Sequence, residues 1–126
     1  MTLGFDEIRA EPSPVGEIVT LTFKDKLRKE DYEQFVPQIE GLMKKEAKIR
    51  LVIELKEFKG WTAGALWEDT KFAARHFNDI ERLAVVGEAG WEKGLTAFIK
   101  PFTTAAVRYF DRRAADQAQA WIRAKD

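Results

Sequence analysis

A run of branched apolar residues at Ile49–Leu55, IRLVIEL, limits the choice of folds more than any other part of the chain. A strand with one face in solvent alternates polar and apolar residues, whereas a strand covered on both faces is apolar almost throughout. The run therefore predicts a central strand of a parallel sheet with helices on both of its faces.

The segments around this run alternate between strand and helix patterns. An opening hairpin is predicted from strands at Phe5–Arg9 and Glu17–Phe23, which are separated by turn residues that include Pro12, Pro14 and Gly16. Two further strands are predicted at Glu81–Gly87 and Ala105–Phe110, and helices at Lys29–Ala47, Thr62–Asn78, Trp91–Phe102 and Ala114–Arg123. After the hairpin, strand and helix alternate strictly, which predicts an α/β fold with right-handed crossovers.

Composition excludes several classes of function. The 126 residues suffice for one domain, and the 21 basic and 21 acidic side chains leave no net basic field for nucleic acid. The chain has no cysteine, one histidine (His76) and one serine (Ser13), so disulfides, thiolate zinc sites and cysteine nucleophiles are excluded. Ser13 lies in a proline-flanked turn without the glycine pattern of a nucleophile elbow. We expect a protein that is not an enzyme and that uses no metal or cofactor.

The cellular location is predicted from the sequence patterns of membrane-spanning helices and secretion signals. No uninterrupted apolar stretch approaches the roughly 20 residues that a membrane-spanning helix needs. The first 14 residues, MTLGFDEIRAEPSP, do not have the basic and apolar regions of a secretion signal. We expect a cytoplasmic protein.

Large aromatic side chains are concentrated on two predicted helices, Thr62–Asn78 and Trp91–Phe102. The later helix carries an apolar stripe at helical spacing, formed by Trp91, Leu95, Phe98, Ile99 and Phe102. The predicted inner side of the earlier helix carries Leu66, Trp67, Thr70, Ala73, Ala74 and Phe77. An apolar helix face in a small α/β protein is usually core, but a small core cannot easily hold all of these rings.

We therefore predict that some of the rings bury the apolar part of a ligand between the two helices, or lie at a bilayer surface. The predicted ligand-binding residues are Trp67, Phe77, Trp91, Leu95, Phe98 and Phe102, with Lys93 and Lys100 for an acidic headgroup. Exposed rings would also suit an interface in a homodimer.

Four phrases along the chain carry a family resemblance. They are KEDYEQF at Lys29–Phe35, FKGWTAGALWEDTKFA at Phe58–Ala73, RLAVVGEAGWEKGLTAFIKPF at Arg82–Phe102 and VRYFD at Val107–Asp111. Together they resemble the SpoIIAA-like proteins, a bacterial family related in fold to the STAS domains of anti-sigma-factor antagonists. The resemblance spans nearly the whole chain and implies a single domain over residues 1–126. It implies a mostly parallel sheet of about five strands, with an antiparallel first strand, and four helices.

The resemblance implies no established enzymatic reaction, since members are thought of as binding or scaffold domains, with suggestions of nonpolar ligands and membrane association. The best-understood relatives are phosphorylated on a serine within a pattern resembling Asp-Ser-Ser-Gly, where the helix after the central strand begins. Here the corresponding stretch is Trp61-Thr62-Ala63-Gly64, so the acceptor serine is replaced by Ala63. Thr62 is the nearby hydroxyl, and a phosphate there would meet helix amides. A helix N-cap is the better supported role for Thr62.

Two functions follow from this reading. The first is a non-enzymatic binding domain for a small nonpolar or amphipathic, lipid-like ligand, located in the cytoplasm or peripherally at the inner membrane surface. The alternative is a partner-switching regulator that resembles the anti-sigma-factor antagonists, binds a protein partner and is controlled by phosphorylation of Thr62.

Overall fold

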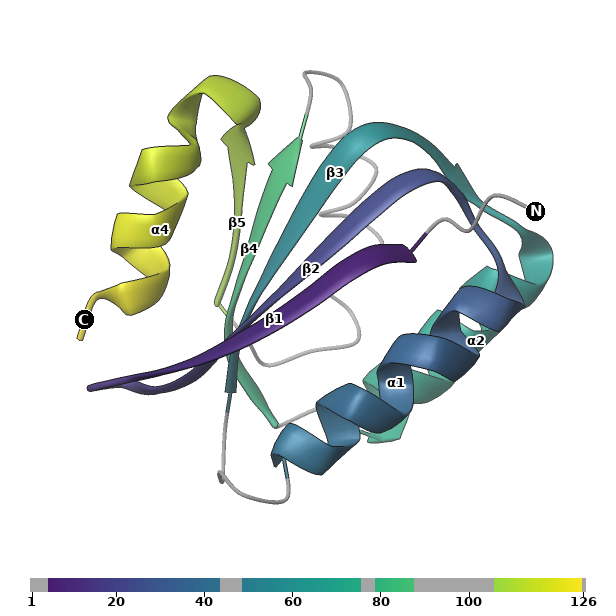
Figure 1. The fold of residues 1–126 in the computed structure, drawn as a ribbon, viewed down its shortest axis with the longest axis horizontal. Helices are drawn as coiled ribbons and strands as arrows, with labels where there is room; N and C mark the ends of the chain where they lie inside the picture. Colours follow the sequence, from purple (N-terminus) through teal and green to yellow (C-terminus); the bar gives the residue numbers. More distant parts are fainter. Residues whose placement is uncertain (1–4, 44–48, 76–78, 88–105, 126) are drawn as a thin grey trace.

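Five strands form one mixed sheet in the computed structural model, which describes residues 5–43, 49–75, 79–87 and 106–125. The strands are β1 (Phe5–Ser13), β2 (Gly16–Leu27), β3 (Ile49–Trp61), β4 (Ile80–Gly87) and β5 (Ala106–Asp111). Their order in the sheet follows the chain, β1-β2-β3-β4-β5 (Figure 1). β1 pairs with β2 in antiparallel orientation and the other neighbours are parallel, so the predicted sheet is confirmed.

Helices cover both faces of this sheet. The described helices are α1 (Lys29–Met43), α2 (Ala63–Arg75) and α4 (Ala115–Arg123), and α4 is preceded by a 3-10 turn at Arg112–Ala114. α1 and α2 lie side by side on one face, and α4 lies on the other (Figure 1). The helix predicted at Trp91–Phe102 lies outside the described residues.

The core is split by the sheet into two layers. In the larger layer, strand residues such as Leu21, Leu51 and Val85 pack with Tyr32, Phe35, Ile39, Ala65 and Phe72 of α1 and α2. In the smaller layer, Ile18, Val52, Ala84, Val86 and Phe110 pack with Ala118 and Ile122 of α4. Successive residues of β3, Leu51 and Val52, thus enter different layers, which confirms that this strand is covered from both sides.

The opening hairpin is longer than predicted because regular pairing continues to its turn. Ser13 pairs with Gly16, and the Ser13 hydroxyl donates to the Gly16 carbonyl at 2.7 Å and accepts from the Val15 amide at 3.2 Å. Gly16 has a φ of 111°, a conformation that glycine adopts without steric cost. Ser13 is therefore a turn residue, as its proline-flanked position predicts.

β3 also runs beyond its predicted end at Leu55, and it does so irregularly. Lys24 of β2 faces Lys56, but the next residue of β2, Asp25, faces Phe58, so Glu57 is an extra residue in β3. Glu57 has a φ of 47°, in the left-handed region. The sequence KEFKGW that follows Leu55 has no period-2 alternation, which is why the pattern did not predict a strand there.

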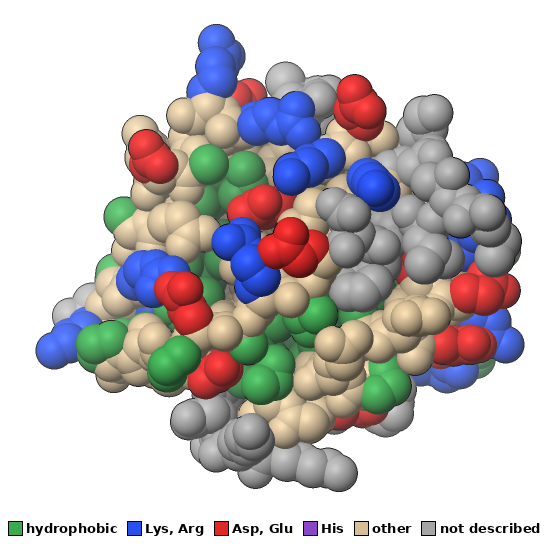
Figure 2. Space-filling model, in the orientation of Figure 1, with side chains coloured by type: hydrophobic (Ala, Val, Ile, Leu, Met, Phe, Trp, Pro, Cys, Tyr) green, Lys and Arg blue, Asp and Glu red, His purple; other side chains and the backbone are tan. Residues whose placement is uncertain are grey.

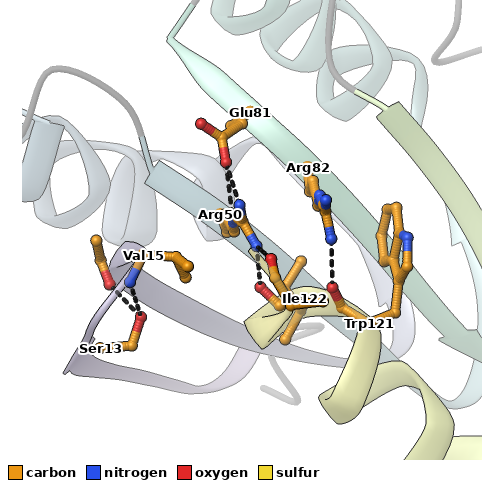
Figure 3. Close-up of polar contacts among 9 residues, drawn as sticks. Ser13, Val15, Arg50, Glu81, Arg82, Trp121 and Ile122 are labelled. Carbon is orange, nitrogen blue, oxygen red and sulfur yellow. Dashed lines mark hydrogen bonds and ion pairs between the residues drawn. The ribbon is translucent and has the colours of Figure 1, made fainter. Parts of the chain in front are cut away.

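Two arginines of the sheet hold the carboxyl end of α4 (Figure 3). Arg50 of β3 is 5% exposed; its Nη1 donates to the Ile122 carbonyl at 2.9 Å and to the Ala124 carbonyl, and its Nε donates to Glu81 at 2.7 Å. Arg82 of β4 donates from Nη1 to the Trp121 carbonyl at 2.7 Å. These contacts satisfy carbonyls that the end of a helix leaves without partners.

The surface beside α4 is charged. Figure 2 shows basic and acidic side chains next to one another between α4 and β1. Ion pairs join Arg9 to Glu7 at 2.9 Å, and join Arg123 of α4 to Glu11 of β1. The smaller core layer therefore borders a polar surface on the side of β1.

Candidate functional site

The amino ends of α1 and α2 meet where β2 and β3 end. Parallel strands place their carboxyl ends at one edge of the sheet, and each of these helices starts within two residues of its strand. The backbone amide of Thr62 donates to the Leu27 carbonyl at 2.9 Å, which joins the start of α2 to the end of β2. A Cβ added at Gly64 would lie 3.4 Å from Cβ of Lys29, so the two helices approach closely here.

Thr62 caps α2, as the sequence predicts. Its Oγ1 accepts a hydrogen bond from the Ala65 amide at 3.1 Å, and the residue is half-buried. An oxygen at this position satisfies one of the amides that a helix start leaves unpaired. The predicted phosphorylation of Thr62 would place a charged group on the same amides, and it stays a prediction.

The start of α1 is fixed by a carboxylate. Oδ2 of Asp31 accepts from the Arg28 amide at 2.7 Å, and the Asp31 amide donates to the Arg28 carbonyl at 3.0 Å. Asp31 is fully buried. This reciprocal pairing joins the end of β2 to the first turn of α1.

Trp67 is the exposed large hydrophobic residue of the described part of the chain, with 64% of its surface accessible. Its predicted place on the inner side of α2 is wrong. Among the α2 side chains that the structure describes, Ala65 and Phe72 face inward, and Trp67 is two residues, or about 200°, around the helix from Ala65. Helical spacing places Trp67 with the apolar residues of α2, but hydrophobicity alone does not distinguish a buried indole from an exposed one.

Charged residues accompany Trp67 on α2. Lys71 and Glu68 form an ion pair of 3.1 Å between Nζ and Oε1, with the Lys71 side chain 44% exposed. An indole beside an ammonium group forms a surface with one apolar and one charged part. Such a surface suits an amphipathic molecule.

The other predicted ligand-binding residues are Phe77, Trp91, Lys93, Leu95, Phe98, Lys100 and Phe102, and all of them lie outside the described residues. Within the described ranges, no three histidine, aspartate or glutamate side chains come together as a metal site requires. No helix among those ranges is long and apolar enough to cross a bilayer.

Comparison with known proteins identifies relatives of this architecture. The model of the SpoIIAA-like family matches residues 18–123. A solved structure, an uncharacterised protein of the DUF3478 family with a SpoIIAA-like fold from Shewanella loihica PV-4, superposes with a TM-score of 0.78. It is 25% identical to this chain, and the match covers 97% of this chain and 96% of that one. No curated protein matches the chain.

Proposed function

Because this chain belongs to the SpoIIAA-like family, we propose that it is a non-enzymatic binding domain for a small nonpolar or amphipathic, lipid-like ligand. The exposed indole of Trp67 is the observation that carries this proposal. The proposed place of action is the cytoplasm, with reversible attachment to the inner membrane surface. The Shewanella protein is uncharacterised, so the proposal rests on the side chains of this chain.

The energetic argument starts from the size of the indole. A tryptophan side chain has about 150–250 Å² of surface, and apolar burial is worth about 25 cal/mol per Å². With 64% of Trp67 accessible, complete burial against a ligand would contribute roughly 3 kcal/mol. The described inward contacts of α2 are made by Ala65 and Phe72, and most of the Trp67 surface is left accessible to a ligand.

The ligand's polar part would lie near Lys71. A lipid headgroup with an anionic oxygen would compete with Glu68 for the Lys71 ammonium, and the indole N–H is a further donor. An exposed ion pair is worth little in water, so its exchange for a headgroup costs little. Binding would depend mainly on apolar contact and only weakly on salt.

Vesicle flotation tests the proposal. Purified protein is mixed with phosphatidylcholine vesicles, and with vesicles that also contain phosphatidylglycerol, and lipid extracted from the purified protein is identified by mass spectrometry. We expect the wild type to float or to carry lipid. Trp67→Ser should reduce the bound fraction about tenfold or more, given the contribution calculated above.

Gln38→Ser is the matched control, because Gln38 is an exposed residue of the neighbouring helix α1 whose main contact is to the backbone carbonyl of its own helix. Its flotation should equal that of the wild type. If the wild type neither floats nor carries lipid, or if Trp67→Ser binds as the wild type does, the proposal is wrong.

A second candidate is a partner-switching regulator controlled through Thr62. The favouring observation is that the hydroxyl of Thr62 lies half-buried on the first turn of α2, where phosphate oxygens would be stabilised by backbone amides. Intact-mass measurement of the protein from its native cells, with and without phosphatase, tests this candidate. A phosphatase-sensitive gain of one phosphate that is lost in Thr62→Ala supports it, and an unmodified Thr62 across growth conditions contradicts it.

A further inference from the structure

A small pocket lies between the last turn of α4 and the strands β1 and β2, on the face of the sheet opposite α1 and α2. Its volume is about 110 Å³, and it is lined by Arg9, Glu11, Ile18, Thr20, Gln119 and Arg123. A site for one water needs about 10–15 Å³ on the same scale, so this space can hold a ligand of several heavy atoms. It is separated by the sheet from Trp67.

The pocket forms because the apolar side of α4 packs on the apolar part of this sheet face and leaves the neighbouring polar part uncovered. α4 packs its buried residues, Ala118 and Ile122, mainly over β4 and its neighbours β3 and β5. Along β2 the same face continues from the apolar Ile18 to Thr20, and β1 presents Arg9 opposite Thr20. The floor is thus an isoleucine and a threonine that are almost completely buried, while the walls are charged.

Two guanidinium groups flank this floor, and both are oriented by neighbours. Arg9 is held by Glu7 at 2.9 Å from Nε and by Glu54 at 3.8 Å from Nη2. Arg123 donates from Nε to Oε1 of Gln119 at 3.3 Å and from Nη2 to Glu11. These contacts use Nε and Nη2, so within the described residues Nη1 of each arginine has no hydrogen-bond partner.

Guanidinium groups supply the positive charge at this position, and an anion would reach them by exchange with carboxylates that they already hold. Arg9, Glu11 and Arg123 line the pocket, and Glu7 and Glu54 contact Arg9, so these five side chains sum to one negative charge. The carboxyl end of a helix normally repels anions, but the final carbonyls of α4 are bound by Arg50 and Arg82. The unused N–H groups and the Thr20 hydroxyl are donors, and planar guanidinium groups match the oxygens of carboxylates and phosphates.

We propose that this pocket binds a small oxyanion, the carboxylate or phosphate group of a metabolite, between the guanidinium groups of Arg9 and Arg123 and above Thr20. Glu11 competes for Arg123, so an entering anion replaces an internal carboxylate. The site lies across the sheet from the proposed lipid-binding surface, so either proposal can fail without the other.

Nuclear magnetic resonance titration tests the site. Sodium phosphate and sodium acetate are added separately to ¹⁵N-labelled protein, with sodium chloride keeping the ionic strength constant. We expect saturable shifts of the Thr20 and Gln119 amides and of the Arg9 and Arg123 Nε–H signals. Saturation by phosphate alone assigns a phosphate ligand, saturation by acetate alone assigns a carboxylate, and saturation by both assigns the common oxyanion chemistry.

Variants with opposite expected effects distinguish binding from loss of structure. Arg9→Gln and Arg123→Gln should each weaken binding about tenfold, because each removes a charge-assisted hydrogen bond. Glu11→Gln should strengthen binding about two- to fivefold, because it removes the competing carboxylate. A partly unfolded variant could not gain affinity in this way.

Arg113→Gln is the matched control, since the Arg113 side chain is 94% exposed and does not line the pocket. It should bind as the wild type does. The proposal is overturned if neither anion gives saturable shifts, if Glu11→Gln does not bind more tightly, or if Arg113→Gln loses as much affinity as Arg9→Gln.

Discussion

Glu57 is a non-glycine residue in the left-handed region of backbone conformation, with a φ of 47°. A side chain in this region costs about 1–2 kcal/mol, because Cβ lies too close to the following carbonyl oxygen. The position is an extra residue in β3, where the pairing with β2 shifts register. A glycine would make the same bulge with less strain.

Glu57→Gly is therefore expected to raise the free energy of unfolding by about 0.5–1 kcal/mol, part of the relief being offset by the greater freedom of glycine in the unfolded chain. Urea denaturation measures this change. Lys56→Gly, at the exposed neighbouring position, should lower the free energy of unfolding by a similar amount. If both substitutions changed the free energy of unfolding in the same direction and by the same amount, the assignment of strain to Glu57 would be contradicted.

Arg50 combines burial with several carbonyl contacts. Arg50→Met keeps a long apolar side chain but leaves the Ile122 and Ala124 carbonyls without these donors, so the free energy of unfolding should fall by about 2–4 kcal/mol. Chemical denaturation followed by circular dichroism measures this loss. Arg113→Met should stay within about 0.5 kcal/mol of the wild type, because its side chain is exposed and its hydrogen bond to Asp111 lies at the surface. A similarly small effect of Arg50→Met would show that solvent replaces the arginine.

The helices depend on polar residues at their ends as well as on their apolar faces. Thr62→Ala removes the Oγ1 acceptor of the Ala65 amide and should lower the free energy of unfolding by about 1 kcal/mol. Thr62→Ser keeps an oxygen at the cap and should remain close to the wild type. Hydrogen exchange of the Ala65 amide checks the mechanism, because exchange should accelerate in the alanine variant and not in the serine variant.

The turn that leads into α4 makes a pH-dependent contribution. The hydrogen bond from the Arg113 amide, and then that from the Arg113 side chain, hold the pKa of Asp111 below its ordinary value. A folded-state pKa below the unfolded value adds stability above the unfolded pKa of about 3.9, and this is lost as the pH falls through the folded-state pKa.

Asp111→Asn should accordingly be less stable than the wild type at pH 7, and the difference should disappear as the pH is lowered toward 2. Urea midpoints of both proteins across this range provide the measurement. Because the carboxylate is exposed, the difference should also shrink in high salt. A difference that persists unchanged at pH 2 would mean that the asparagine perturbs the turn by other means.

At the scale of the whole molecule, the sequence predicts the strands of the sheet better than the contacts that hold α4 on it. The apolar run at Ile49–Leu55 identifies the central strand, since burial on both faces leaves a pattern that a local window can detect. The contacts of Arg50 could not be found in this way. Its partners on α4 are more than 70 residues away, and an arginine in a strand gives no local sign of what it binds.

At the candidate sites too, features that depend on near neighbours in the sequence were predictable and the others were not. The cap at Thr62 was predictable, because capping depends on neighbours within three residues. The exposure of Trp67 was not, because helical periodicity ranks positions by hydrophobicity, and a tryptophan that faces solvent then resembles one that faces the core. The pocket was not predictable either, since its residues come from β1, β2 and α4.

The sheet order, in which every strand pairs with the one before it along the chain, has a consequence for synthesis. As the polypeptide leaves the ribosome, each new strand finds a partner that has already emerged, so the sheet can grow from its amino-terminal edge. The carbonyls of Ile122 and Ala124, which Arg50 binds, emerge after all five strands. Arg50 would therefore lack these two acceptors until residue 124 has left the ribosome, and the docking of α4 would then supply them.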